Sequence, residues 1–295
     1  MKIISIINQK GGVGKTTTVA NLSAALAAAG KKVAVIDLDP QSHLTLHFGF
    51  EPADDTVTIY DVLCEQNTLD EAMVKVRENL WVIPATTDLA AATSDLVSKP
   101  HRNMILRNAV DAMKAEVDFI VIDCPPALGL LTLNALVATD DVIIPLQPQF
   151  LALQGLSKLL RTIEVVQQRL NPKLRVSGVI FCMFEQVTRL ARDVVTDVMK
   201  FFKSARTSGK PWSGACVYHT AIRRNIKLAE SPSFGQSIFE YDAQCNGAKD
   251  YKAFADEFLS RLVAKPETCY PAVPMPSITQ EHLIAEEDYF PAGHD

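Results

Sequence analysis

The sequence predicts a single α/β domain built on a doubly wound, mostly parallel β-sheet with helices on both of its faces. Apolar, strand-like runs alternate with segments of helical periodicity from the first residues to about residue 263, which is typical of βαβ units. Of the 295 residues, 48% are hydrophobic, enough for one large core. The sequence contains no internal repeat and no mid-chain linker that would indicate a second domain.

The predicted elements follow in order along the chain. Strands are expected at residues 2–8, 32–37, 80–84, 118–123, 141–146, 175–183 and 214–218. Helices are expected at residues 16–29, 58–64, 68–76, 87–95, 102–115, 130–137, 153–169, 189–203 and 248–263. Asn171 and Pro172 end the helix at 153–169, because the residue before a proline disfavours helical conformation. Residues 1–263 therefore form the expected domain, and residues 264–295 form an acidic tail with five prolines.

A glycine-rich loop joins the first predicted strand to the first predicted helix. Residues 8–17 read Asn-Gln-Lys-Gly-Gly-Val-Gly-Lys-Thr-Thr, and strand, loop and helix in this order form the setting of a phosphate-binding P-loop. The glycines let backbone N–H groups surround phosphate oxygens, and the helix start directs unpaired donors at the same charge. Lys15 is expected to contact the outer phosphates and Thr16 to ligate Mg²⁺ through its hydroxyl. The candidate nucleotide-binding residues of the loop are Gly11, Gly12, Val13, Gly14, Lys15, Thr16 and Thr17.

Acidic residues follow two further strand-like runs. Asp37 and Asp39 come at the end of the run that begins at residue 32, and Asp123 ends the apolar run 119–122. Residues at the carboxyl ends of parallel strands face the ligand crevice of such a sheet. A carboxylate there can orient a water molecule or hold the hydration shell of Mg²⁺. Any one of these aspartates could be a helix or turn cap, but three beside a P-loop favour roles in metal binding and catalysis.

A second lysine, Lys10, begins the loop, within the pattern Lys-Gly-Gly-x-Gly-Lys-Thr. The segment resembles the deviant Walker A motif of the ParA/MinD/nitrogenase-iron-protein class of ATPases. The resemblance implies that Lys10 reaches across a dimer interface to the partner's nucleotide, where its charge acts as an arginine finger does. It also implies that Asp39 positions the attacking water, that Asp37 supports the metal and the loop, and that Asp123 binds Mg²⁺ through water. The catalytic candidates are thus Lys10, Lys15 and Asp39.

Further blocks of sequence resemble the ParA/Soj chromosome- and plasmid-partition ATPases, and the resemblance runs from residue 1 to about 262. The blocks lie at residues 83–86, 130–136, 153–156, 225–235, 241–242 and 247–248. The block at 225–235 distinguishes the partition branch from MinD and from the iron protein. The resemblance implies a weak, partner-stimulated ATPase that uses ATP and Mg²⁺ and forms a homodimer on ATP binding. It further implies nonspecific binding to DNA and a ParB-like partner protein.

Charge is unevenly distributed along the chain. The net charge is −5, yet residues 266–295 hold six acidic residues and no lysine or arginine, which leaves 28 acidic against 29 basic groups elsewhere. Basic residues gather between 189 and 227, as expected of a protein that binds phosphate backbones, although a solvated helix face has the same composition. Arg224 matches an arginine that ParA/Soj proteins use for nonspecific DNA binding. The candidate DNA-binding residues are Arg189, Arg192, Arg223, Arg224 and Lys227.

The chain departs from the family pattern at three places. Arg223 stands where the family usually has a proline, which could strengthen DNA contact or alter the adenine pocket. A second family arginine aligns with Val187, and Arg189 lies two positions further on. The segment at 204–218 is longer than usual and is a candidate for binding a partner.

Contacts to the adenine base are expected from two places. One is the strand end at Cys182 and Met183, and the other is the loop at 220–225, which includes Arg224. Met183 and Arg224 therefore complete the set of nucleotide-binding candidates.

Composition bears on localisation. No apolar run approaches the roughly 20 residues needed to span a membrane, and the N-terminus enters a strand at once, without a signal peptide. The six cysteines show no Cys-x-x-Cys spacing, which indicates a reduced protein without a metal cluster. We therefore expect a cytoplasmic, nucleoid-associated protein that does not bind membranes.

Three alternatives stay open. A MinD-like membrane positioner is disfavoured by the tail, which carries no basic amphipathic face. An iron-protein-type reductase needs cluster-ligating cysteines, for which Cys124 after the 118–123 strand is no substitute. An ATPase of the same kind that positions a protein cluster or organelle cannot be separated from a DNA-segregating one by sequence.

Overall fold

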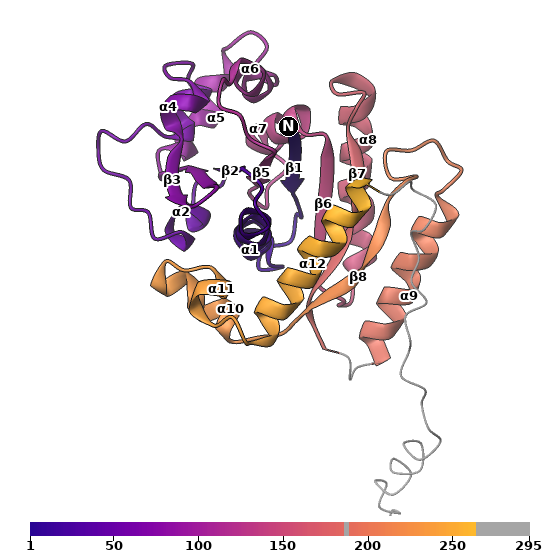
Figure 1. The fold of residues 1–295 in the computed structure, drawn as a ribbon. Coiled ribbons are helices and arrows are strands. Elements are labelled where there is room, and N and C mark those ends of the chain that lie inside the picture. Colours follow the sequence, from indigo (N-terminus) through magenta and orange to yellow (C-terminus); the bar gives the residue numbers. More distant parts are fainter. Residues whose placement is uncertain (186–188, 264–295) are drawn as a thin grey trace, which may run out of the picture.

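The computed structural model describes residues 1–185 and 189–263; the predicted tail at 264–295 and Val187 lie outside the described residues. Within these ranges, eight strands form one sheet in the order β3-β4-β2-β5-β1-β6-β7-β8 (Figure 1). The strands are β1 (Lys2–Ile6), β2 (Val33–Asp37), β3 (Val74–Arg77), β4 (Leu80–Ile83), β5 (Phe119–Asp123), β6 (Asp141–Leu146), β7 (Arg175–Phe184) and β8 (Cys216–Arg223). All neighbours run parallel except β3 and β4. The predicted fold class is confirmed.

The central strands are apolar on both sides, because helices cover both faces of the sheet. Ile4 and Ile6 of β1 face one core, whereas Ile3 and Ile7 face the other, as the period of two along a strand requires. The first core is closed by α1 (Lys15–Ala28), α2 (His43–His47), α11 (Ile238–Tyr241) and α12 (Asn246–Val263).

The opposite face is covered by a longer series of helices. They are α3 (Ile59–Leu63), α4 (Leu69–Ala72), α5 (Leu89–Val97), α6 (Ile105–Ala112), α7 (Leu130–Ala138), α8 (Ala152–Arg169) and α9 (Arg189–Ser204). The short helices α10 (Lys227–Glu230) and η1 (Ser231–Phe234) link β8 to α11. Strand β1 lies between β5 and β6, so the loop that follows it opens where the order of strands reverses, the usual place of a ligand crevice.

The helix predicted at 68–76 is wrong in its second half. Helix α4 ends at Ala72, and β3 follows it, antiparallel to β4. Val74 and Val76 are β-branched and alternate with charged residues, which suits an edge strand better than a helix. The chain then reverses through Asn79, which has a φ of 56°. Asparagine tolerates this left-handed conformation better than most residues.

The other edge of the sheet also differs from the prediction. Strand β8 continues to Arg223, five residues beyond its predicted end, so residues 220–223 belong to a strand rather than to a loop. The helices α2, α10 and α11 span four or five residues each, too short for a detectable helical period, and none was predicted.

The segment at 204–218 packs against the body of the protein. Trp212 is 8% exposed and belongs to the core beneath α8 and α9. The carbonyl of Pro211 accepts a hydrogen bond from Val176 N–H at 2.9 Å, and the ammonium of Lys210 pairs with Glu164 of α8. The additional residues thus close the amino end of the sheet beside β7.

Candidate nucleotide site

The predicted P-loop lies between β1 and α1 and has the backbone that its glycines allow. Gly12 and Gly14 have φ values of 70° and 91°, a left-handed conformation that an L side chain adopts only with strain. Helix α1 begins directly afterwards, at Lys15, so its first N–H groups and its positive end face the loop. The sequence-predicted arrangement of strand, loop and helix is therefore present.

Two side chains hold this loop in place. The amide of Asn8 donates to the carbonyl of Pro145 at 2.7 Å, and its oxygen accepts from the N–H of Lys10 at 3.0 Å. Lys15 is 8% exposed, and its ammonium lies 3.4 Å from the carbonyl of Lys10. Lys10 itself is exposed, and its ammonium donates to the side chain of Gln149. The two lysines thus occupy different positions, one inside the loop and one at its rim.

The aspartates that end β2 and β5 lie side by side. Asp37 and Asp123 are register partners, and both are at most 1% exposed. The hydroxyl of Thr16, on the first turn of α1, donates to Oδ2 of Asp123 at 2.6 Å. Burial and the neighbouring Asp37 raise the pKa of Asp123 well above its ordinary value.

These residues suit a hard divalent cation. Oδ1 of Asp123 is buried and has no hydrogen-bond partner among the described residues, and it lies on the carboxylate that the Thr16 hydroxyl contacts. Magnesium prefers a site with one or two carboxylates that leaves positions for water and for phosphate oxygens. The described residues contain no cluster of three or more His, Cys, Asp or Glu that would enclose a metal. An open site of the magnesium type fits this donor set.

Asp37 is held by the helix that follows it. Its Oδ2 accepts from the N–H of Thr45 at 2.9 Å and from the Thr45 hydroxyl at 2.7 Å. Burial raises the pKa of Asp37 to about 6, although the hydrogen bonds from Thr45 oppose the shift. Asp39 is half-buried; its N–H donates to Asp37 Oδ1 at 3.2 Å, and its carboxylate accepts from Gln41 N–H at 3.0 Å.

Three positions that support the site were not predicted. Asn8 and Gln149 contact the loop from the ends of β1 and β6, and Thr45 holds Asp37. The only signal for Asn8 was its place between an apolar strand and the first glycine. Gln149 and Thr45 lie 139 and 8 residues from their partners, and no motif connects them.

The residues predicted to contact adenine lie on neighbouring strand ends. Cys182 and Met183 lie just before Phe184, the last residue of β7, and next to the last residues of β8. Cys182 is buried under the P-loop, with its sulfur 3.8 Å from the Thr18 hydroxyl, so it packs beneath the site. Met183 is 42% exposed with φ 50°, and Gln147 donates to its sulfur. Of the two, Met183 is placed at the surface, where a base can reach it.

The predicted DNA-binding residues gather where β7 and β8 end. Arg224 pairs with Glu185, the residue that follows β7, at 3.1 Å, and 76% of its side chain is exposed. Lys227 pairs with Glu230 at 3.1 Å and lies over the ring of Tyr241. Arg192 is exposed on the second turn of α9, whereas Arg189 begins that helix and its side chain lies outside the described part.

Arg223 has a different environment. Its guanidinium contacts both carboxylate oxygens of Asp250, at 2.6 and 3.0 Å, and its N–H donates to the same group. Asp250 is 7% exposed, on the first turns of α12. This hydrogen bonding raises the pKa of Arg223 further. The additional cation therefore joins β8 to α12, and much of its charge is neutralised locally.

Fold and site together define a P-loop nucleotide-binding protein. A family model described as an AAA domain matches residues 1–176. The chain is 45% identical over 257 residues to the sporulation initiation inhibitor protein Soj of Bacillus subtilis, covering 87% of this chain and 97% of the relative. The chain belongs to the ParA/Soj family of P-loop ATPases.

Solved structures agree with this assignment. Cobyrinic acid a,c-diamide synthase from Mycobacterium smegmatis with bound ADP and magnesium is 35% identical, with a TM-score of 0.74 over 90% of this chain and 96% of that one. A putative plasmid partition protein from Borrelia burgdorferi bound to AMPPNP is 26% identical, with a TM-score of 0.70 over 88% and 99% of the two chains. Both similarities extend over most of this chain.

Proposed function

We propose that this protein is a ParA-type partition ATPase that ATP and Mg²⁺ assemble into a homodimer. The dimer binds DNA nonspecifically, and a ParB-like partner stimulates a slow hydrolysis of ATP to ADP and phosphate. Relatives named for chromosome partitioning, at 40–42% identity over most of the chain, support this assignment. In this proposal residues 1–263 act as the ATPase domain, and the acidic, proline-containing residues 264–295 follow it in the sequence.

The observation that carries the proposal is the group formed by Lys15, Thr16 and Asp123. A buried ammonium lies at the start of a helix, and beside it a hydroxyl contacts a carboxylate that has one unpartnered, buried oxygen. The lysine and the helix N-terminus are both positive, and a bound triphosphate would supply the negatively charged partner that they need. Magnesium, held by Thr16 and by Asp123 through water, would neutralise the charge that develops on the phosphate oxygens. Asp37, next to Asp123, supports this arrangement from β2.

The position of Lys10 supports the dimer. Its side chain lies at the rim of the loop, outside the pocket occupied by Lys15, and its only described hydrogen-bond acceptor is the side chain of Gln149. A neutral amide is a weak partner for an ammonium group compared with a phosphate. A second copy facing this rim would receive the lysine at its own nucleotide. Asp39, half-buried after β2, is left to orient the attacking water.

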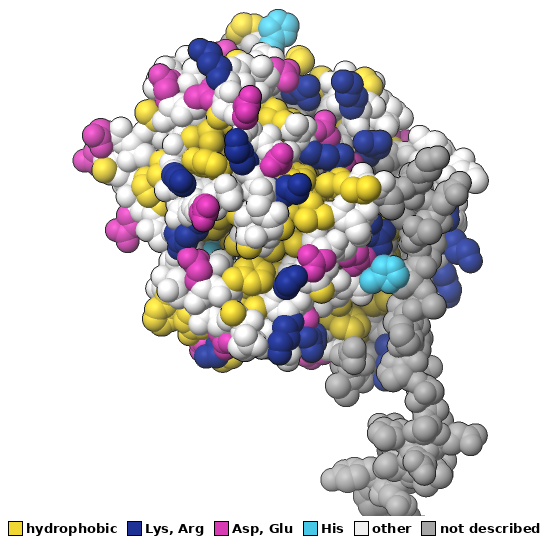
Figure 2. All heavy atoms as spheres, in the orientation of Figure 1, with side chains coloured by type: hydrophobic (Ala, Val, Ile, Leu, Met, Phe, Trp, Pro, Cys, Tyr) yellow, Lys and Arg dark blue, Asp and Glu magenta, His cyan; other side chains and the backbone are white. Residues whose placement is uncertain are grey.

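The DNA-binding part of the proposal rests on the exposed cations after β7 and β8. In the view of Figure 2, basic and acidic side chains are interspersed, so that face of one protomer offers little surface of a single sign. Pairing two protomers doubles the number of phosphate contacts, which makes affinity steep in both salt and dimerisation. Arg192, Arg224 and Lys227 would make these contacts, and DNA binding would put the protein at the nucleoid.

The proposal also covers the contacts to the adenine base and the kind of cargo that the protein moves. Met183 near the end of β7 and Arg224 just after β8 would contact the base. The cargo is a chromosome or plasmid. A protein cluster or organelle would be moved by the same chemistry, and the identity of the stimulating partner distinguishes the two. No helix among the described residues is long and apolar enough to cross a membrane.

The test measures DNA binding by the full chain with ATP, with ADP and without nucleotide. We expect tight binding with ATP and Mg²⁺ only, with an affinity that falls steeply with salt. Arg224→Ala should weaken DNA binding, whereas Arg161→Ala, an exposed arginine on α8, should not. Equal binding in the three nucleotide states would contradict the switch. Binding to liposomes in place of DNA would favour the MinD-like alternative.

A further inference from the structure

A cleft of about 760 Å³ lies at the end of the sheet opposite the P-loop. The strands β1, β6, β7 and β8 line it with their first residues, from Lys2 to Cys216. The last turn of α12 and the segment at 209–214 close its sides. None of the predicted nucleotide-site or DNA-binding residues lines this cleft, so it requires an explanation of its own.

The charge of the lining is mainly positive. It contains five cationic side chains and two carboxylates: Lys2, Lys173, Arg175, Lys210 and Arg261 against Asp140 and Asp141. Asp141 is shared by Lys2 and by Arg175, which lies 3.8 Å away and is 67% exposed. Lys173 is exposed in the turn that precedes β7. These two exposed cations, Lys173 and Arg175, give the cleft its capacity to bind an anion.

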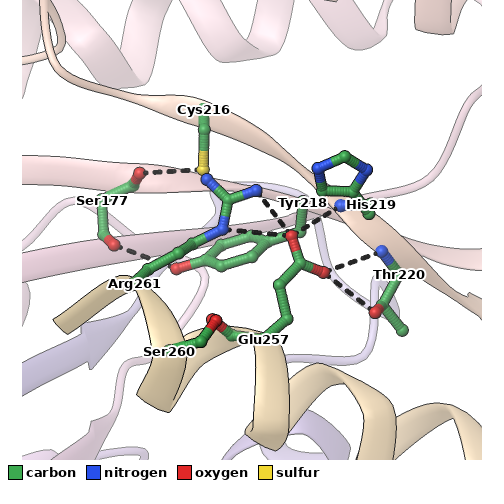
Figure 3. A network of polar contacts seen from close by, with 8 residues as sticks. All are labelled: Ser177, Cys216, Tyr218, His219, Thr220, Glu257, Ser260 and Arg261. Atoms are coloured by element: carbon green, nitrogen blue, oxygen red, sulfur yellow. Dashed lines mark hydrogen bonds and ion pairs between the residues drawn. The ribbon is translucent and has the colours of Figure 1, made fainter. Parts of the chain in front are cut away.

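One wall of the cleft is held rigidly by a polar network (Figure 3). Glu257 of α12 accepts the N–H groups of His219 and Thr220 at 2.8 and 2.9 Å, where the pairing of β8 is irregular. Arg261, one turn further along α12, donates to Glu257 at 2.6 Å and lies over the ring of Tyr218. The cleft is therefore formed before any ligand arrives, which lowers the entropic cost of binding.

The chain itself supplies a matching anion. Arg261 and Leu262 line the cleft, and the described chain ends one residue later, at Val263. The residues beyond 265 include six carboxylates and no lysine or arginine, together with Tyr270, Tyr289 and Phe290. Thirty-two further residues, at about 3.3 Å each when extended, are more than enough to turn back into the cleft. Leu262, which is 40% exposed at the edge of the cleft, offers its aromatic residues apolar surface.

We propose that the acidic C-terminal segment 266–295 docks in this cleft of its own chain. The exposed face of α9 is a poorer match, because Asp193 and Asp197 lie among its cations. Tethering gives a segment of the same chain an effective concentration of about the mM range, so a weak site is enough to hold it. Docking needs neither ATP nor DNA, so it holds or fails independently of the proposed function.

The experiment uses the full chain with a photoreactive p-benzoylphenylalanine at position 289. At low salt we expect cross-links within one chain, mapped by mass spectrometry to accessible cleft residues such as Lys210, Ser213 and Leu262. Mixing light and heavy isotope-labelled protein separates these from cross-links between chains. The double variant Lys173→Glu, Arg175→Glu should lower the yield about tenfold, since two exposed attractions become repulsions. The matched reversal Lys158→Glu, Arg161→Glu on α8 should leave it unchanged.

Exchanging the charges of the cleft and of the tail distinguishes direct pairing between them from damage to the fold. Adding Glu286→Lys, Glu287→Lys and Asp288→Lys to the cleft double variant should restore cross-linking, while the three tail changes alone should lower it. The proposal is overturned by cross-links to another face, by cross-links between chains, by an absence of cross-links at low salt, or by yields that the cleft variant leaves unaltered.

Discussion

The two ends of the sheet contain similar kinds of charged residues but arrange them in opposite ways. At the carboxyl end, Asp37 and Asp123 lie side by side in the interior, and both carboxyl groups have raised pKa values. At the amino end, Asp141 is paired with Lys2 and Arg175, and Lys210 with Glu164. The first arrangement leaves charged groups without partners of opposite charge, which a ligand can provide. In the second, most charged groups are paired within the protein. Local instability of this kind is typical of functional sites.

Among substitutions at the carboxyl end of the sheet, we expect the largest effect from a change of Lys10. Lys10→Ala should leave ATP binding by a monomer intact and lower DNA- and partner-stimulated turnover by about a thousandfold, the contribution of finger residues in other systems. The reason is that the exposed ammonium would act on the second protomer's nucleotide. Phosphate release assays combined with nucleotide titrations measure both quantities. Lys158→Ala, an exposed lysine on α8, serves as control. Unaltered stimulated turnover in Lys10→Ala would contradict the proposed dimer.

The second prediction contrasts lysines at the two ends of the sheet. Lys15→Gln should weaken ATP binding by about a hundredfold, because a charge-assisted contact worth up to ~3 kcal/mol is lost from a buried position. Lys32→Gln, just before β2 at the amino end, should leave the affinity unchanged. Calorimetric titration with a non-hydrolysable ATP analogue gives both values. An equal effect of the two substitutions would mean that the P-loop lysine does not contact the phosphates.

The third prediction compares two glycines with left-handed backbones. Gly235, which follows η1, and Gly209, beside the cleft, have φ values of 62° and 66°. A Cβ on Gly235 would lie 2.6 Å from the Cα of Gly49, whereas nothing lies within 4 Å of one on Gly209. Gly209→Ala should therefore cost about 1 kcal/mol of unfolding free energy, and Gly235→Ala about 3 kcal/mol because of the added clash. Urea denaturation measures both, and equal costs would argue against the close contact.

The last prediction is a pH dependence from His47 on α2, similar in size to the Gly235 effect. Burial lowers the pKa of His47 to about 4, opposed by a hydrogen bond with the Gln236 backbone and by the charge of Glu240. Between the unfolded pKa near 6.5 and pH 4, the unfolded chain binds the proton and the folded chain does not, so stability falls as the pH falls. The loss attributable to this group reaches about 3 kcal/mol at pH 4.

The measurement compares the wild type with His47→Gln in urea denaturation at pH 7 and pH 4.5. The difference in unfolding free energy between the two proteins should shift in favour of the variant at the lower pH. A difference that stays constant with pH would show that His47 takes up its proton equally in both states.

The predictions from sequence succeeded where chemistry is encoded by neighbouring residues. The P-loop between β1 and α1 has its predicted place, and Asp37 and Asp123 end adjacent strands. Their proximity could be expected because parallel strands bring their carboxyl ends to one edge. The failures occurred where local pattern is weak: β3 was taken for the end of a helix, and β8 was predicted to end five residues early.

Two questions depended on contacts between distant residues. Whether Arg223 serves DNA or the fold depends on Asp250, 27 residues later, which no spacing rule connects to it. Whether the cations near residues 173 and 210 form a site depends on α12 closing over the first residues of β7 and β8. Neither relation has a sequence signature, because the partners are brought together only when the sheet is complete.

The sequence by itself determined the phosphate loop, the strand-end carboxylates and the alternation of strand and helix. Each of these is a property of a short segment and follows from backbone conformation, hydrophobic period and the direction of parallel strands. Tertiary structure alone decided which charges are neutralised and which are left for a ligand. The reason is that the electrostatic state of a side chain depends on its burial and on neighbours that the chain contributes from far away.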